Sequence, residues 1–147
     1  MIGPYGEKFL DGGTGANNPI VELWNEAKDV WSSDTLEAQL RCLISVGTGV
    51  PKVAAFGDYP SEIIETILAI ATDTQKTAED FHARHNALDK DNIYFRFNVQ
   101  SGLEDVGLDE SKKKAVIAAA TRSYMGQQTV QNQLRLCGQR LQERKGL

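Results

Sequence analysis

Residues 42–46 form a short apolar run, Cys-Leu-Ile-Ser-Val, which is closed by the turn Gly47-Thr48-Gly49. The run is too short for an ordinary helix and does not alternate between polar and apolar residues. That pattern is typical of a strand that is buried on both faces. Because strands of this kind belong to sheets covered by helices, the run predicts an α/β fold.

Four stretches of the chain have apolar residues at the spacing of amphipathic helices. They lie at 19–31, at 61–85, at 110–125 and from Val130 to Leu141. Asn18 and Asp109 are good N-cap residues for the first and third stretches. Gly126 weakens the helical pattern between the last two, so we expect a break there.

A second strand is predicted over residues 93–99. Its apolar residues alternate with polar ones, which indicates a half-exposed strand near a sheet edge. The order loop, helix, strand, helix, strand, helix, helix favours α/β packing over a helix bundle. Two strands make a poor sheet by themselves, so we expect further strands from sequence upstream of this chain.

Composition and charge exclude several classes of protein. The formal net charge is −4, and the 16 lysines and arginines are scattered, so no basic face for nucleic acid is predicted. Cys42 and Cys137 are the only cysteines, which give neither a disulfide framework nor metal-ligand spacing. No apolar run approaches the roughly 18 to 20 residues of a membrane span. We therefore expect a cytoplasmic protein that can act peripherally at a membrane surface.

The stretch Asp11-Gly12-Gly13-Thr14-Gly15-Ala16-Asn17-Asn18-Pro19 carries the most chemical information. An acid is followed by glycines that can take positive φ and let the backbone approach another group closely. Such an acid can be presented at the end of a strand as a reactive group. It can also cap or order a turn, which composition alone favours, and the residue pattern leaves both interpretations open.

This stretch, followed by an amphipathic helix, resembles the second active-site motif of the patatin-like phospholipases. Residues 43–49 are similar to that family's next strand and its Gly-Thr-Gly turn. Residues 94–99 and the downstream Gly102-Leu103 and Val106-Gly107-Leu108-Asp109 resemble the last strand and terminal helix of fungal-type members. The resemblance identifies residues 1–147 as the C-terminal half of an acyl hydrolase domain. It implies part of a three-layer sandwich, in which helices flank a central, mostly parallel sheet.

The resemblance also implies a reaction. In this family a serine in a G-x-S-x-G elbow attacks a glycerolipid ester, and Asp11 inherits the role of its base without an intervening histidine. Gly12 and Gly13 would shape the loop, and Asn17 and Asn18 would order it and cap the next helix. The implied mechanism is calcium-independent and requires no metal or cofactor. A carboxylate with a pKa near 4 is a weak base. It can therefore act on serine only when it is held within hydrogen-bond reach and when backbone N–H donors stabilise the resulting oxyanion.

The chain departs from the family because no G-x-S-x-G occurs in it. Ser45 has no glycine two residues before it, so we interpret it as a buried strand serine. A base without its nucleophile should lose nearly all covalent catalysis, and we expect the chain to be inactive alone. The alternative is a non-catalytic module that associates with an upstream half-domain or with itself as a homo-oligomer.

Three further features allow a functional interpretation. His82 and His85 lie one helical turn apart and could hold a metal if a third ligand converged, but we expect cationic groups near a helix C-terminus. The turn at 47–49 suggests a nucleotide site, although Lys52 replaces the last glycine of the Rossmann fingerprint. Trp24 and Trp31 share a helix face, which predicts core residues, or a docking surface if they prove exposed.

Overall fold

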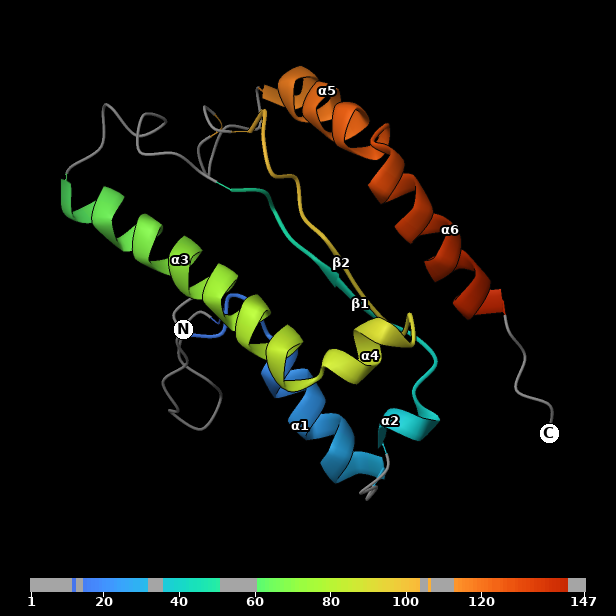
Figure 1. Ribbon diagram of the computed structural model, residues 1–147. Coiled ribbons are helices and arrows are strands. Elements are labelled where there is room, and N and C mark those ends of the chain that lie inside the picture. The colour runs from blue at the N-terminus through green and yellow to red at the C-terminus, as the bar shows by residue number, and fades with distance from the viewer. Residues whose placement is uncertain are drawn as a thin grey trace, which may run out of the picture.

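The computed structural model describes residue 12 and residues 15–31, 36–50, 61–103, 106 and 113–142. The described part of the chain is mixed α/β and mostly helical, with a small two-stranded parallel sheet. Figure 1 shows the two strands running between α3 and the pair α5 and α6. The elements are α1 Ile20–Trp31, α2 Leu36–Gln39, β1 Leu43–Val46, α3 Ser61–Arg84, α4 Asn86–Lys90, β2 Tyr94–Phe97, α5 Lys114–Met125 and α6 Gln128–Gln142.

The two described strands are parallel, as the predicted mostly parallel sheet requires. Leu43 pairs with Tyr94 and Val46 pairs with Phe97, so the two strands share one direction. Parallel strands need a long crossover, and α3 and α4 supply it between β1 and β2. The three-layer sandwich and its additional strands stay predictions.

The four predicted helices are present within the described residues. The helix expected at 61–85 is α3, and the break expected at Gly126 separates α5 from α6. The predicted start at 110 and its Asp109 cap lie outside the described residues. The short helices α2 and α4 were not predicted, because four or five residues hold too little periodicity to reveal a helix. None of the described helices is long and apolar enough to cross a bilayer.

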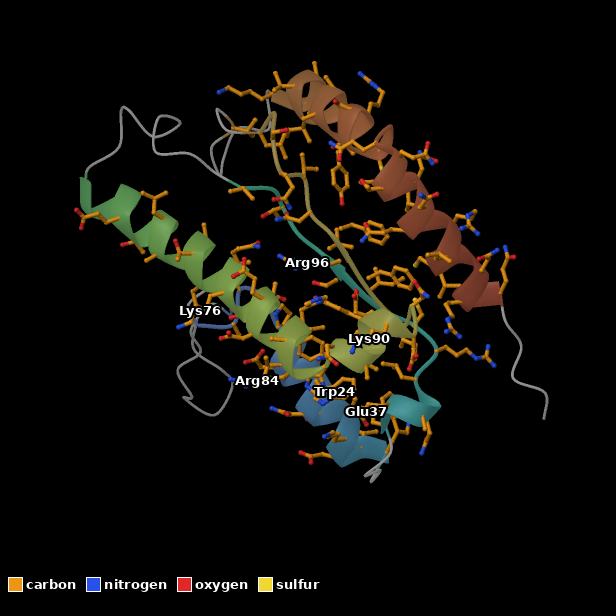
Figure 2. The ribbon with its side chains drawn as sticks, in the orientation of Figure 1. Trp24, Glu37, Lys76, Arg84, Lys90 and Arg96 are labelled. Atoms are coloured by element: carbon orange, nitrogen blue, oxygen red, sulfur yellow. The ribbon has the colours of Figure 1, made fainter. Side chains whose placement is uncertain are left out.

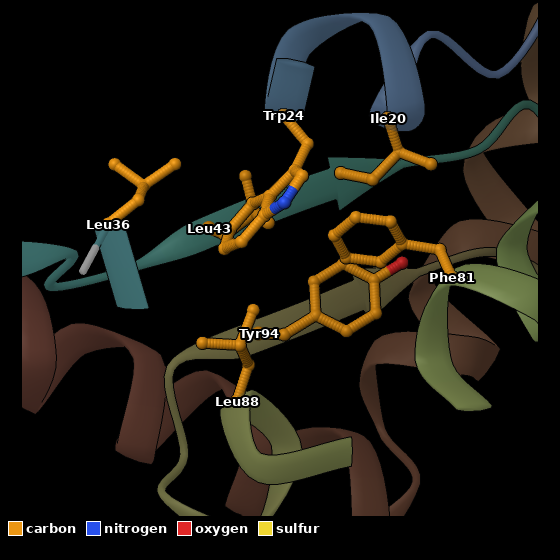
Figure 3. Close-up of a cluster of buried hydrophobic side chains, with 7 residues drawn as sticks. All are labelled: Ile20, Trp24, Leu36, Leu43, Phe81, Leu88 and Tyr94. Atoms are coloured by element: carbon orange, nitrogen blue, oxygen red, sulfur yellow. The ribbon is translucent and has the colours of Figure 1, made fainter. Parts of the chain in front are cut away.

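The hydrophobic core lies on one face of the sheet. Figure 3 shows Trp24 of α1, Phe81 of α3 and Tyr94 of β2 converging there. The ring of Phe81 meets Trp24 edge-on at 5.7 Å between centroids and Tyr94 at 5.3 Å, both favourable aromatic geometries. The core cluster consists of Ile20, Trp24, Leu36, Leu43, Phe81, Leu88 and Tyr94.

The prediction that β1 is buried on both faces is wrong. Leu43 and Ser45 are buried, whereas the side chains of Ile44 and Val46 are 41% and 75% exposed. The buried pair faces the core cluster. On the opposite face of the sheet, α6 contacts β2 and leaves the Ile44 and Val46 side of β1 exposed. The apolar sequence of β1 therefore lacks a cover on one side within the described structure.

The prediction that β2 is half-exposed is also wrong. Tyr94 and Phe95 point to opposite faces of the strand, yet their side chains are only 6% and 3% exposed. The reason is that β2 is covered by the core cluster on one face and by α6 on the other. Alternation of polar and apolar residues misleads here because Tyr94 buries its aromatic ring despite its hydroxyl.

Candidate functional site

A pocket of about 190 Å³ opens where β1 ends and α1 begins. This is the carboxyl end of a parallel strand, the edge at which open α/β sheets usually bind ligands. The loop before α1, the end of β1, and one residue each from α3 and β2 form its walls. The lining residues are Asn17, Asn18, Pro19, Ile20, Leu23, Ile44, Ser45, Val46, Gly47, Thr48, Thr74 and Arg96.

Two asparagines fasten the loop before α1 to helix α3. The Asn17 amide donates to the Thr74 hydroxyl at 2.8 Å, and the buried Asn18 amide donates to the Thr74 carbonyl at 3.3 Å. The Thr74 hydroxyl in turn donates to the Ile70 carbonyl at 2.7 Å. Asn17 and Asn18 therefore cross-link this loop to a helix that is distant in the sequence. The N-cap role of Asn18 stays a prediction.

Among the described residues of this loop, Gly15 holds a conformation that depends on glycine. Its φ of 121° lies in the region that only glycine adopts easily. The Gly12 carbonyl accepts a hydrogen bond from the Ala16 N–H at 2.9 Å, while a Cβ on Gly12 would meet no atom within 4 Å. Asp11 and Gly13 lie outside the described residues, so the role of Asp11 as a base stays a prediction.

The Gly47-Thr48-Gly49 turn is fixed by Asn98, a residue whose role the sequence did not reveal. The Asn98 side-chain oxygen accepts the Gly49 N–H at 2.8 Å and would lie 2.3 Å from a Cβ on Gly47. Gly49 itself has a φ of 99°. The side chain of Asn98 thus occupies the space beside Gly47, and the side chain of Leu103 occupies the space beside Gly49. The turn is therefore closely packed at the pocket wall.

Ser45 and Arg96 form the polar side of the pocket. Ser45 is buried, as predicted, and its hydroxyl accepts a hydrogen bond from Arg96 Nη1 at 2.7 Å. Beside them on the same face of the sheet lies the buried Tyr94 hydroxyl, for which no described residue offers a hydrogen bond of normal geometry. Burial raises the Tyr94 pKa, and the nearby Arg96 charge and Ser45 hydroxyl only partly oppose this. Tyr94 therefore stays a neutral phenol at physiological pH.

The two histidines do not form a metal site in the described structure. His82 Nδ1 lies 3.9 Å from an Asp89 carboxylate oxygen, and no cluster of three or more metal-binding side chains occurs among the described residues. The His85 ring lies 4.6 Å from Trp24 and 4.5 Å from Phe81. Burial lowers the His85 pKa, which disfavours the cationic form predicted from the sequence for this residue.

The tryptophans of α1 have different environments. Trp24 is a core residue with 5% exposure, whereas Trp31 is 62% exposed. Their separation of seven residues places them on nearly the same face of the helix, but the buried residues of α1, Ile20 and Trp24, both precede its last two turns. The core prediction is confirmed for Trp24 and wrong for Trp31.

These features describe an α/β protein whose pocket lies at the carboxyl end of a parallel strand, with polar groups on one side and apolar groups on the other. The chain is similar to calcium-independent phospholipase A2-gamma from several mammals. Identity is 32% over 107 residues with the Mus musculus protein, covering 69% of this chain and 12% of the relative. It is 30% over 104 residues with the proteins of Oryctolagus cuniculus and Homo sapiens, covering 71% of this chain and 13% of each.

The similarity is a distant relationship to a phospholipase, and it supports a lipid hydrolase origin for this chain. The aligned segment spans only about an eighth of each relative's length. No protein-family model matches the chain, and no solved structure matches it significantly.

Proposed function

We propose that this chain is the aspartate-bearing part of a patatin-like lipid acyl hydrolase that cleaves ester bonds of glycerolipids. The observation that carries the proposal is the similarity to calcium-independent phospholipase A2-gamma over 71% of the chain. The pocket supports it, because its wall includes Asn17 and Asn18 of the loop that follows Asp11. The resemblance of that loop to the patatin-type motif points to the same reaction class.

In the proposed reaction Asp11 takes the proton from a serine hydroxyl as the serine oxygen attacks the ester carbonyl. The bond to the alcohol then breaks, and the leaving alcohol takes that proton from Asp11. Water attacks the acyl-serine in the same way, which releases the fatty acid and restores the serine. The serine belongs to a G-x-S-x-G segment that this chain lacks, so the upstream half of the domain must supply it. The cross-links from Asn17 and Asn18 to α3 fix the loop beside Asp11, which favours the alignment that a weak base needs. Affiliation with the fungal-type branch and a cytoplasmic, membrane-peripheral location are part of this proposal.

The test is reconstitution of esterase activity. The purified chain is assayed with a short p-nitrophenyl ester alone and after addition of the G-x-S-x-G segment of a related phospholipase. We expect activity only in the mixture, and Asp11→Asn should reduce it by orders of magnitude. Arg135→Gln, on the exposed side of α6 and away from this loop, serves as a folded control and should leave the activity of the mixture unchanged. Hydrolysis by the chain alone, abolished by Asp11→Asn, would contradict the missing-nucleophile argument.

A second candidate function is association without catalysis. It is favoured by the open side of β1, where Ile44 and Val46 are exposed next to Leu23, which is itself 52% exposed. Exposed apolar side chains on an edge strand are a common pairing surface. The occupant would be the upstream half-domain or a second copy of the chain.

Sedimentation velocity separates these two occupants. A chain that associates with itself sediments as a dimer at micromolar concentration, and Val46→Lys returns it to a monomer without loss of stability. A chain that awaits an upstream half sediments as a monomer alone and forms a heterodimer when that half is added. Monomers in both experiments would rule out the association function.

A further inference from the structure

We propose that Arg96 binds the phosphate group of a glycerophospholipid in the pocket between β1 and α1. This inference rests on the proposed lipid hydrolase function and names the part of the substrate that the pocket recognises. Figure 2 shows Arg96 between the strands and α3, where β2 places it at the pocket wall.

The first argument is the hydrogen bonding of the Arg96 guanidinium. Arginine carries five N–H donors and a permanent positive charge. Within the described part of the chain, the half-buried Arg96 makes one hydrogen bond, to the neutral Ser45 hydroxyl at 2.7 Å. Most of its donors are therefore left for another acceptor. A half-buried cation without a counter-ion is unfavourable, and an anionic ligand would correct this.

The second argument is the charge of the surroundings. Among the described residues, no aspartate or glutamate lines this pocket. Arg96 also borders a second hollow of about 550 Å³, which is lined mainly by residues of α5, α6 and the segment around the end of β2. Apart from Arg96, its described lining residues are neutral. Among the described lining residues of both hollows, the Arg96 guanidinium is the charged group. An arginine so placed favours phosphate or carboxylate, which match its planar donors.

The third argument is the shape and polarity of the pocket. Its volume of about 190 Å³ is below the roughly 300 to 1,000 Å³ typical of sites that enclose a whole ligand. The pocket therefore suits a head group better than a complete lipid. Ile44 and Val46 are exposed at the rim, where acyl chains could leave the pocket along apolar surface. Free inorganic phosphate would gain nothing from this rim, so the lipid is the better match.

Binding to soluble probes tests the site independently of hydrolysis. Isothermal titration calorimetry of the full chain with glycerol 3-phosphate should show saturable binding that weakens by about tenfold or more in Arg96→Gln. Arg96→Lys keeps the positive charge but loses the planar pair of guanidinium N–H donors. Its affinity should therefore lie between those of the wild type and Arg96→Gln. The matched control is Arg135→Gln on the exposed side of α6, which should bind like the wild type. Equal binding by all variants, or none by the wild type, would overturn the proposal.

Vesicles distinguish the two sources of phosphate. The chain should float with phosphatidylcholine vesicles and not with vesicles of a phosphate-free galactolipid, and Arg96→Gln should abolish the difference. Binding of inorganic phosphate without vesicle binding would overturn the lipid assignment. If the chain binds acetate more tightly than phosphate, the proposal that this site recognises a phosphate group is overturned. If the probes bind as expected but reconstituted hydrolysis fails, the phosphate site stands and the proposed hydrolase function falls.

Discussion

The sulfur atoms of Cys42 and Cys137 lie 3.8 Å apart, although 95 positions separate the residues in the sequence. This distance exceeds the roughly 2.05 Å of a disulfide, and both residues are free thiols. The contact joins the residue before β1 to the middle of α6. Burial raises the pKa of the Cys42 thiol from 9.0 to about 11, with the hydrogen bond to Cys137 adding to the effect.

We predict that Cys42 reacts slowly with alkylating agents at neutral pH. Only the thiolate reacts, and a pKa of about 11 instead of 9.0 lowers its population roughly a hundredfold. Mass spectrometry after timed iodoacetamide treatment should show much faster labelling in urea than in the folded chain. Because the folded pKa is raised, this group's contribution to stability is present below pH 9 and lost as the pH rises through 11. Equal labelling rates in both states would contradict the prediction.

We predict that acid destabilises the chain through His85. Burial between Trp24 and Phe81 lowers the His85 pKa below its usual 6.5, so the folded state prefers the neutral ring. Its contribution to stability is therefore present above pH 6.5 and lost as the pH falls through the folded pKa. Urea unfolding followed by tryptophan fluorescence at pH 7.5 and pH 5 measures this loss.

His82 provides a matched control for the acid effect. It lies on the same helix but its side chain is exposed beside Asp89. His85→Asn should remove much of the pH dependence of the unfolding free energy, whereas His82→Asn should preserve it. A larger loss of pH dependence in His82→Asn than in His85→Asn would contradict the prediction that His85 causes the acid sensitivity.

We predict that Gly47→Ala destabilises the chain by about 1 to 3 kcal/mol. A Cβ at this position would lie 2.3 Å from the Asn98 side-chain oxygen, which is buried and holds the Gly49 N–H. The same substitution at Gly138 in α6 is the control, since a Cβ there meets no atom within 4 Å. Gly138→Ala should stabilise the chain by about 0.5 to 1 kcal/mol, because alanine favours the helix. Urea denaturation measures both.

We predict that Asn18→Ala costs about 1 to 2 kcal/mol of unfolding free energy and Asn17→Ala no more than about 0.5. Both amides donate to Thr74, but Asn18 is buried and Asn17 is exposed to competing water. Loss of the Asn18 hydrogen bond removes that partner from the Thr74 carbonyl at a partly buried position. Denaturant unfolding ranks the two, and an equal cost would show that burial does not decide the strength of this cross-link.

The sequence by itself determined the class of fold and most of its helices. Strong periodicity located α1, α3, α5 and α6, because an amphipathic stripe repeats over several turns. The loop before α1 could also be predicted from the sequence, because asparagine and glycine are typical of turns and loops. The relationship to phospholipases was visible in the same residues.

Only the tertiary structure decided which surfaces are covered and which residues meet. The burial of β2 and the exposure of one face of β1 depend on the position of α6, and no local pattern records that position. The partners Asn18 and Thr74, and Ser45 and Arg96, lie more than 50 residues apart, so only folding brings them together. Local sequence encodes periodicity, whereas burial and long-range hydrogen bonds arise from the packing of distant elements against one another.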